Sequence, residues 1–383
     1  MKHFLLVISF LLCQLGVYSQ VANAIHKVDL PKGLMVFCNA TDGSGKMWIG
    51  LGDGLSSGAV AYLSNDFTLK QFSLSILGVT GSVATAAKER GGSVIMAGNL
   101  VSDQGYPCIV RTLPDSIEIV PLPLKSSSLV VNSIAVLKDN DIWLSTSKGL
   151  LVNSAANGWQ YYGTGEGLPS SYVNMVVQDF RGLIWVATTA GVVAFDSNRV
   201  IQPTGQVVTS VDILYQDRIG YLWAGSSLDA GGLSVFNGEL WQTFSASDGL
   251  VSNSTSSLYS DTKQQLWVSS CLSQQTGGLS MFDGKEWIAF TFPKHLAKPC
   301  IDNIVEDKEG NIWFSGPLDI STGGGLSVLS SGSWIDIGDD TYFPANQVVH
   351  MFLFSNRLCI SAKEGFYCIK TTEVLNYYKR KGY

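Results

Sequence analysis

Charged residues are scarce in this chain, at 15% of 383 residues, and the net charge is −6. The globular part has no basic run, which argues against nucleic acid and anionic membrane surfaces as partners. Beyond the N-terminus no apolar run is long enough to span a bilayer, so we expect no membrane span.

Residues suited to catalysis or metal binding are also few. There are four histidines, and His26, His295 and His350 are scattered without metal-ligand spacing. The sequence has no nucleophile elbow, phosphate-binding glycine loop or Cys-x-x-Cys pair. We therefore expect no catalytic residues, no metal and no cofactor.

The N-terminus has the pattern of a secretory signal. Lys2 precedes an apolar run over residues 4–12, and small residues then permit cleavage. This pattern predicts a signal peptide over residues 1–19 and one domain over residues 20–383. We expect a periplasmic or extracellular monomer. The alternative is a lipoprotein signal retaining Cys13, which the bulky leucines before it disfavour.

Glycine and tryptophan are plentiful, with 40 and 10 residues, and they recur in one pattern. An Asp and a short polar turn precede an apolar-Trp-apolar strand, most clearly over residues 179–186 and 307–314. Ile95 and Cys359 hold the Trp position in two degenerate copies. The other repeat centres are Trp48, Trp143, Trp185, Trp223, Trp267 and Trp313. A period of roughly 40–50 residues predicts an all-β fold, a single β-propeller of eight four-stranded blades, with seven as the alternative.

Each repeat can be divided into four strands, A to D. In the fourth, we expect A over residues 173–178, B over 183–188, C over 191–195 and D near 207–209. The B strands are apolar at consecutive positions, as expected for a strand buried on both faces, so each Trp should be a structural core residue. The repeated aspartates, such as Asp179 and Asp307, should be turn residues rather than catalytic acids.

The repeats resemble those of the two-component regulator propeller family. The resemblance rests on Gly167-Leu168-Pro169, Asp179, Gly182, Trp185, Thr188 and Gly191, and on Asp248-Gly249-Leu250 and Trp267 in a later repeat. In that family such propellers are the periplasmic sensing part of hybrid histidine kinases, often tied to glycan uptake. This sequence ends at Tyr383 without a following β-sandwich, membrane span or kinase, so we expect a stand-alone propeller.

Insertions between strands B and C predict a binding face. The B–C turn is short in blades three, four and eight and long in the other five, at residues 52–58, 99–106, 226–231, 272–277 and 317–324. Insertions gathered on one face of a repeat array often mark its binding face, although plain loop drift would give the same pattern. The candidate ligand-binding residues are Asp53, Asp103, Tyr106, Asp229, Gln274 and Asp319.

These observations favour a non-catalytic extracytoplasmic ligand-binding or sensing propeller. A glycan or an envelope or extracellular protein is the expected partner. One alternative is a propeller-type polysaccharide lyase or glycosidase, which would need His and carboxylates converging on the channel. Another is a scaffold for envelope proteins.

Six cysteines remain after residue 19. Strand topology places Cys271 and Cys300 on the same face in neighbouring blades, which predicts a disulfide between them. Cys359 and Cys368 flank a tight hairpin, where a cross-strand bridge is strained, so we expect them reduced. Cys38 and Cys108 are expected as buried free thiols.

The two ends of the chain should close the ring together. Residues 25–30 precede the first A strand and have no partner in their own blade. We expect them at the edge of the last blade, beside residues 365–370 or residues 374–378, where they would cover an open strand edge.

Overall fold

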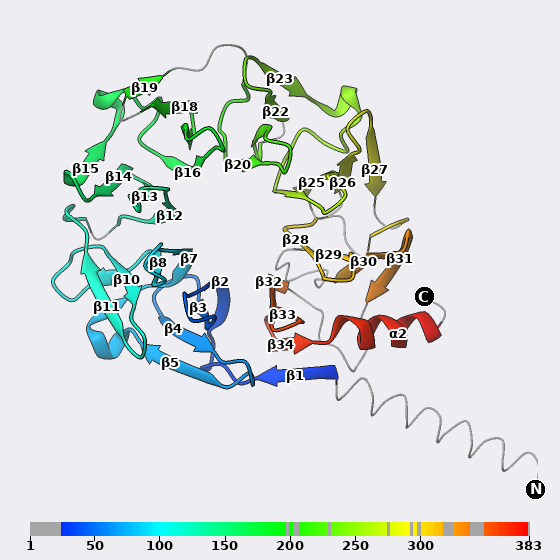
Figure 1. The fold of residues 1–383 in the computed structure, drawn as a ribbon, viewed down its shortest axis with the longest axis horizontal. Coiled ribbons are helices and arrows are strands. Elements are labelled where there is room, and N and C mark those ends of the chain that lie inside the picture. Colours follow the sequence, from blue (N-terminus) through cyan, green and yellow to red (C-terminus); the bar gives the residue numbers. More distant parts are fainter. Residues whose placement is uncertain are drawn as a thin grey trace, which may run out of the picture.

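The computed structural model describes residues 24–126, 128–196, 199–201, 207–228, 231–273, 276–291, 294–296, 300–316, 325–337 and 348–381. Within them the chain forms eight four-stranded antiparallel sheets in a ring (Figure 1). The prediction of an eight-bladed propeller is therefore confirmed, and seven blades is wrong. The expected signal peptide over residues 1–19, with Cys13, lies outside the described residues.

In each blade the strands follow one another outwards from the centre of the ring, and we name them A to D in that order (Figure 1). Blade 1 contains β2 (Met35–Thr41), β3 (Met47–Gly52), β4 (Gly58–Leu63) and β5 (Leu69–Ser73), and blade 2 contains β7 (Val83–Lys88), β8 (Val94–Gly98), β10 (Cys108–Thr112) and β11 (Ile117–Pro121). Blade 3 contains β12 (Val131–Val136), β13 (Ile142–Thr146), β14 (Gly149–Ser154) and β15 (Gly158–Tyr162). Blade 4 contains β16 (Val173–Gln178), β17 (Ile184–Thr188), β18 (Gly191–Asp196) and β19 (Arg199–Ile201).

Blades 5 to 8 complete the ring, and the last one takes its D strand from the N-terminus. Blade 5 contains β20 (Ile213–Gln216), β21 (Leu222–Gly225), β22 (Leu233–Phe236) and β23 (Trp241–Phe244), and blade 6 contains β24 (Ser257–Ser260), β25 (Leu266–Ser273), β26 (Thr276–Phe282) and β27 (Trp287–Thr291). Blade 7 contains β28 (Asn303–Glu306), β29 (Ile312–Ser315), β30 (Leu326–Ser330) and β31 (Ser333–Ile337). Blade 8 contains β32 (Val348–Phe354), β33 (Arg357–Ala362), β34 (Gly365–Ile369) and β1 (Ile25–Val28).

The core lies between neighbouring blades. The B strands are buried along their length, as β3, β8 and β13 illustrate, because each is covered by a blade on both faces. The tryptophan in each of the six Trp-containing B strands is at most 2% exposed, which confirms these residues as structural; they are Trp48, Trp143, Trp185, Trp223, Trp267 and Trp313.

In five blades a buried aspartate joins the A–B turn to the core tryptophan. In blade 5, one carboxylate oxygen of Asp217 accepts the backbone N–H groups of Ile219 (3.1 Å) and Tyr221 (2.9 Å). The other oxygen accepts the indole N–H of Trp223 at 2.8 Å. The same indole contact recurs from Asp42, Asp179, Asp261 and Asp307. The repeated aspartates are therefore turn residues that also position the core.

The two ends of the chain meet in blade 8, where β1 lies beside β34 (Figure 1). The register pairs Ile25 with Ile369 and Val28 with Phe366. The Ala24 carbonyl accepts the Lys370 backbone N–H at 3.0 Å and a guanidinium N–H of Arg357 at 3.2 Å. This closure confirms the expected pairing of the N-terminal strand with residues 365–370.

The alternative neighbour of the N-terminal strand and the predicted D strand of blade 4 are both wrong. Residues 374–378 belong to helix α2 (Thr371–Lys381), whose residues Val374, Leu375, Tyr377 and Tyr378 form one buried face beside blade 7 (Figure 1). The D strand of blade 4 is β19, not residues 207–209. Val208 is instead buried in the connection to blade 5, where its N–H donates to Ser234 Oγ at 3.1 Å. Within the described residues no helix has the length and apolar character required to cross a membrane.

Removing the N-terminal strand should open the ring. Deleting residues 20–30 removes a four-pair ladder and exposes the edge of β34. We expect the melting temperature to fall by several degrees, equivalent to roughly 2 kcal/mol or more of unfolding free energy. Lys27→Thr, which changes only an exposed side chain of β1, should leave it within about one degree. Equal melting temperatures for the deletion variant and the parent would show that the pairing of β1 with β34 does not stabilise the ring.

The indole contact predicts the cost of an amide at the aspartate position. In Asp217→Asn one oxygen still accepts the turn N–H groups, but the amide N–H₂ then faces the Trp223 N–H. An unmet buried donor costs about 1–3 kcal/mol, which chemical denaturation would measure. Asp66→Asn is the control, because Asp66 closes an exposed turn without an indole. If Asp217→Asn and Asp66→Asn lower the free energy of unfolding by the same small amount, the indole contact does not contribute to stability.

Candidate ligand-binding face

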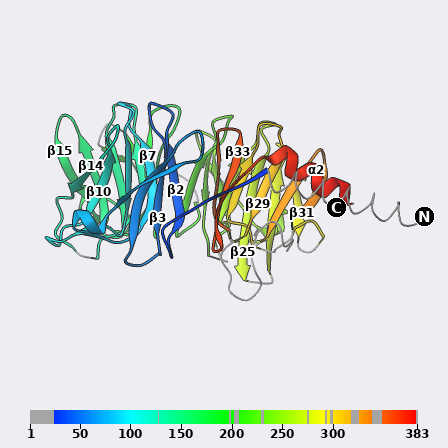
Figure 2. The ribbon, with the colours of Figure 1, turned by 90° about the horizontal axis from the view of Figure 1, so that it is seen from below.

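The strand order gives the propeller two distinct faces. B–C turns and D–A connections emerge on one, which we call the B–C face; A–B and C–D turns emerge on the other, the A–B face. The B–C face is the lower one in Figure 2, where β25 extends beyond the neighbouring strands. The B strands that precede the five long insertions all end on this face, as the strand assignment predicts.

Asp53 lies on this face, and its own turn occupies one of its two carboxylate oxygens. Its carboxylate accepts the backbone N–H groups of Leu55, Ser56 and Ser57 at 2.8–3.0 Å, and the Ser82 hydroxyl at 3.1 Å. The hydrogen bonds from the Ser57 and Leu55 backbones hold the pKa of Asp53 well below its usual range. All four of these bonds converge on Oδ1, so Asp53 shapes the blade 1 loop with one oxygen. Its Oδ2 accepts no hydrogen bond from a described residue, and Asp53 remains a candidate for ligand contact.

The insertion in blade 2 is a folded element rather than a free loop. It contains β9 (Val101–Ser102), which pairs with β6 (Val79–Thr80) of the preceding connection. Asp103 is exposed, and its backbone N–H donates to the Gly78 carbonyl at 2.7 Å. Tyr106 is half-buried, with the Lys125 ammonium 5.6 Å from its ring centre. Both residues remain candidates for ligand contact.

The other three sequence candidates, Asp229, Gln274 and Asp319, lie outside the described residues. They belong to the insertions of blades 5, 6 and 7, which are neighbours in the ring. The structure does describe the base from which these three insertions arise.

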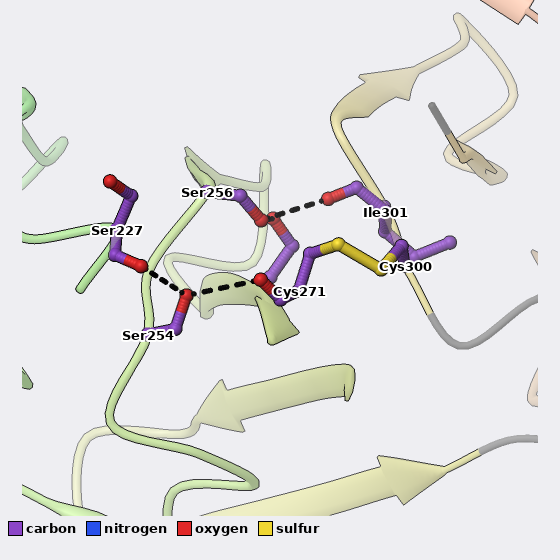
Figure 3. Close-up of a disulfide and its surroundings, with 7 residues drawn as sticks. Ser227, Ser254, Ser256, Cys271, Cys300 and Ile301 are labelled. Carbon is purple, nitrogen blue, oxygen red and sulfur yellow. Dashed lines mark hydrogen bonds between the residues drawn. A yellow bond between two sulfur atoms is a disulfide. The ribbon is translucent and has the colours of Figure 1, made fainter. Parts of the chain in front are cut away.

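A disulfide fastens this base. Cys271, in the extended hairpin of β25 and β26, is bonded to Cys300 at the entry to blade 7, with Cα atoms 4.6 Å apart (Figure 3). The predicted bridge is confirmed, and with it the placement of both segments on one face. The bond links blades 6 and 7 covalently where the channel opens.

Serine hydroxyls continue the same linkage to the neighbouring blade. Ser254 Oγ lies 3.0 Å from the Ser227 carbonyl and 3.4 Å from the Cys271 carbonyl, so it connects blades 5 and 6 (Figure 3). Ser256 Oγ donates to the Ile301 carbonyl of blade 7 at 3.1 Å. The B–C face is therefore held together across blades 5 to 7.

Polar residues at the start of the A strands in blades 3 to 7 form a series that the sequence analysis did not identify. Asn132 Nδ2 donates to the Val173 carbonyl of the next blade, and Asn174 Nδ2 to the Val211 carbonyl, each at 2.8 Å. In blades 3 and 4 this residue is the extra one of an A-strand bulge. The available signal was a polar residue directly after the buried residue that leads into the A strand in blades 3 to 7, namely Asn132, Asn174, Asp212, Ser256 and Asp302.

Asp302 holds this ring position in blade 7 but behaves differently. A carboxylate cannot donate to the carbonyl of the next blade, and the Asp302 side chain makes no hydrogen bond to any described residue. The inter-blade bond comes instead from Asn303 to the Val349 carbonyl at 3.4 Å. Asp302 is exposed at the channel mouth, yet desolvation by the surrounding protein raises its pKa. It is therefore a carboxylate with free acceptor capacity, two residues after the bridged Cys300.

The prediction for the second cysteine pair is wrong. Cys359 and Cys368 face each other directly in β33 and β34, with Cα atoms 4.1 Å apart, and they form a disulfide. The close register brings the two sulfurs together; both residues are fully buried, and Cys359 holds the Trp position of the repeat. Cys38 and Cys108 are buried free thiols as predicted, and burial raises their pKa values to about 12 and about 11.

The histidines are dispersed. His350 Nε2 lies 2.8 Å from Asn39 Oδ1 and so connects blade 8 to blade 1, and burial lowers its pKa to about 4. His26 is on β1, and His295 follows β27. The described ranges contain no group of three or more His, Cys, Asp or Glu residues able to hold a metal ion.

No protein-family model matches this chain, and no curated protein matches it either. Solved propellers do match. Virginiamycin B lyase from Staphylococcus aureus is 12% identical, with 90% of this chain and 98% of that chain covered and a TM-score of 0.52. YCF48 from Cyanidioschyzon merolae is 12% identical, with 90% and 98% covered and a TM-score of 0.53.

An extracellular domain also matches, from a protein described as a one component system, BT4673 of B. thetaiotaomicron. The identity is 15% and the TM-score 0.44, with 90% of this chain but 54% of that chain covered. This chain thus spans about half the length of that domain. At these identities the comparisons show a shared propeller fold. Membership of the two-component regulator family stays a prediction.

Breaking the bridge should loosen blades 6 and 7. In a Cys271→Ser, Cys300→Ser double variant, the loop of 29 residues is no longer closed, which should cost about 3 kcal/mol of unfolding free energy. Hydrogen exchange should accelerate in β25 and β26. Cys38→Ser is the control, since that thiol is unbridged and lies in β2 of blade 1. If hydrogen exchange in β25 and β26 is unchanged in the double variant, the serine contacts alone hold the base of these insertions in place.

Proposed function

We propose that this protein is a non-catalytic extracytoplasmic binding or sensing module that holds its ligand on the B–C face, at the channel mouth beside blades 5 to 7. The free carboxylate of Asp302 is the observation that carries this proposal. It lies behind a disulfide and among hydroxyl contacts that fix the base of three long insertions. A rigid base reduces the entropy lost when loops close on a ligand. Two disulfides also fit an oxidising, extracytoplasmic compartment.

A glycan is the ligand class that we propose, with a protein partner as the alternative. The Asp302 carboxylate only accepts hydrogen bonds, so its partner must supply donors, as sugar hydroxyl groups do. Tyr172, in the connection entering blade 4 on the same face, is 43% exposed and offers an apolar ring face. The sensing role rests on the resemblance of the repeats to two-component regulator propellers.

We propose binding rather than catalysis because the repeated aspartates are already occupied. Asp179, Asp217, Asp261 and Asp307 each hold a turn and an indole, and His350 is buried between two blades. A polysaccharide lyase or glycosidase would need a convergent acid and base.

A glycan array followed by thermal-shift titration tests this proposal. Asp302→Asn should weaken the best glycan about tenfold or more, because a hydrogen bond to a charged acceptor is lost. The fold should persist, since Asn occupies the equivalent position in blades 3 and 4. Asp283→Asn, an exposed turn residue of the A–B face, is the matched control and should not change the affinity.

Two results would contradict the proposal. If Asp302→Asn binds the array ligand as tightly as the parent, this part of the channel mouth is not the site. If the purified protein degrades a polysaccharide and folded Asp302→Asn does not, the chain is an enzyme.

A further inference from the structure

The A–B face, opposite the proposed ligand site, exposes large apolar side chains at blades 4 and 5. Phe180 is 67% exposed, Leu240 60%, Ile219 57% and Tyr221 40%. Phe180 and Ile219 lie in consecutive A–B turns, Tyr221 directly precedes β21, and Leu240 is in the C–D turn of blade 5. A group of this kind on one face is typical of an interaction site.

Contacts between the turns show that these side chains form one surface. The Phe180 ring lies over Gly220, where an added Cβ would be 3.8 Å from Phe180 Cδ2. The neighbouring Arg181 reaches the C–D turn of blade 5, with its Nη1 3.5 Å from the Gly238 carbonyl and its guanidinium 5.5 Å from the Phe236 ring centre. The surface therefore runs from the blade 4 turn to the turn that carries Leu240.

The fold holds Phe180 firmly without requiring an aromatic there. Its backbone N–H donates to Gln216 Oε1 at 2.9 Å, and its carbonyl accepts the Lys138 ammonium at 3.3 Å. Both contacts involve only backbone atoms of Phe180. The equivalent turn position is polar or glycine in the other seven blades, namely Gly43, Arg90, Lys138, Arg218, Thr262, Lys308 and Asn356. The fold therefore does not require the exposed aromatic side chain of Phe180.

Cations surround this surface. Each A–B turn from blade 2 to blade 7 carries one exposed cation: Arg90, Lys138, Arg181, Arg218, Lys263 and Lys308. In blades 4 to 6 the acids of the same turns, Asp179, Asp217 and Asp261, are buried and bonded to tryptophans. Arg181 is paired with Asp179 at 3.0 Å, and the C–D turns of blades 5 and 6 carry the exposed acids Glu239, Asp283 and Glu286. The attraction for an anion is therefore local to the A–B turns, where Lys138 and Arg218 make no ion pair with a described residue.

We propose that Phe180, Ile219, Tyr221 and Leu240, with Arg181 and Arg218, form a docking surface for a protein segment that carries acidic side chains around an aromatic or branched aliphatic anchor. Exposed aromatic residues beside arginines dominate binding energy in protein interfaces. The aliphatic Ile219 and Leu240 favour a protein over a glycan, because sugars stack on flat rings. This surface goes beyond the proposed function, since it lies on the other face.

An array of peptides of about twelve residues tests the surface. Each peptide has a Leu or Phe anchor flanked by Asp and Glu, and reference peptides carry Lys for the acids or Ser for the anchor. Fluorescence anisotropy with the full chain should show preference for the acidic, anchored peptides. Their affinity should fall severalfold between roughly 50 and 300 mM salt, because exposed charges are screened.

Phe180→Ser should weaken the best peptide about tenfold while the protein keeps its melting temperature, since polar residues hold this turn position elsewhere. Leu55→Ser is the matched control, because Leu55 is 76% exposed on the B–C face; it should leave peptide affinity unchanged. Asp302→Asn should also leave it unchanged, so failure of this surface and failure of the glycan site are separate results.

Three outcomes would overturn the docking surface. The acidic peptides could bind no better than the Lys or Ser references, or Phe180→Ser could bind them like the parent. Phe180→Ser could also abolish only glycan binding, or only self-association seen by light scattering, which would assign the surface to a sugar or to a second copy of the chain.

Discussion

In five blades the indole N–H of the core tryptophan is held by the carboxylate that also closes the A–B turn. This contact fixes the turn, the start of strand B and the largest side chain between two blades at once. Neighbouring turns are then placed against one another, as in the bond from the Lys138 backbone N–H to Gln178 of the next blade, at 3.1 Å. The surfaces of both faces depend on this alignment.

Blades without the contact replace it in different ways. In blade 2, Ile95 fills the Trp position, and the buried Glu89 pairs with Arg111 at 3.0 Å. In blade 8 a disulfide fills the same space. Blade 3 keeps Trp143 but has Leu137 where the acid would be, and the indole N–H finds no partner among the described residues. The fold therefore tolerates an unmet indole donor at this position when the packing is kept.

Much of the architecture was predictable because the repeat marks the same buried positions in every blade. Trp185 and Trp313 identified the B strands, and the Asp-to-Trp spacing identified the turns. Strand topology alone was enough to pair Cys271 with Cys300. The N-terminal strand could be placed because it had no blade of its own.

The remaining features depend on three-dimensional contacts that no local pattern carries. Val374–Tyr378 contains residues that also suit a strand, and only packing beside blade 7 selects the helix. Asp53 was a reasonable binding residue by composition, but only the structure shows that its own turn occupies one of its two carboxylate oxygens. Asp302 was missed because its unused oxygens become visible only by comparison with Asn132 and Asn174 in the folded ring.

The pairing of β1 with β34 in blade 8 also constrains the order in which the fold can be completed during synthesis. The bond from Arg357 to the Ala24 carbonyl joins groups 333 positions apart, at nearly opposite ends of the chain. At about 5–20 residues per second, the first strand to leave the ribosome waits roughly 20–70 seconds for its partner. Throughout that interval the first blade has no neighbour on one side, and its apolar flank, including Val36 and Leu51, is uncovered. A growing chain of this shape is a natural client for a chaperone that shields the first blade until the last one arrives.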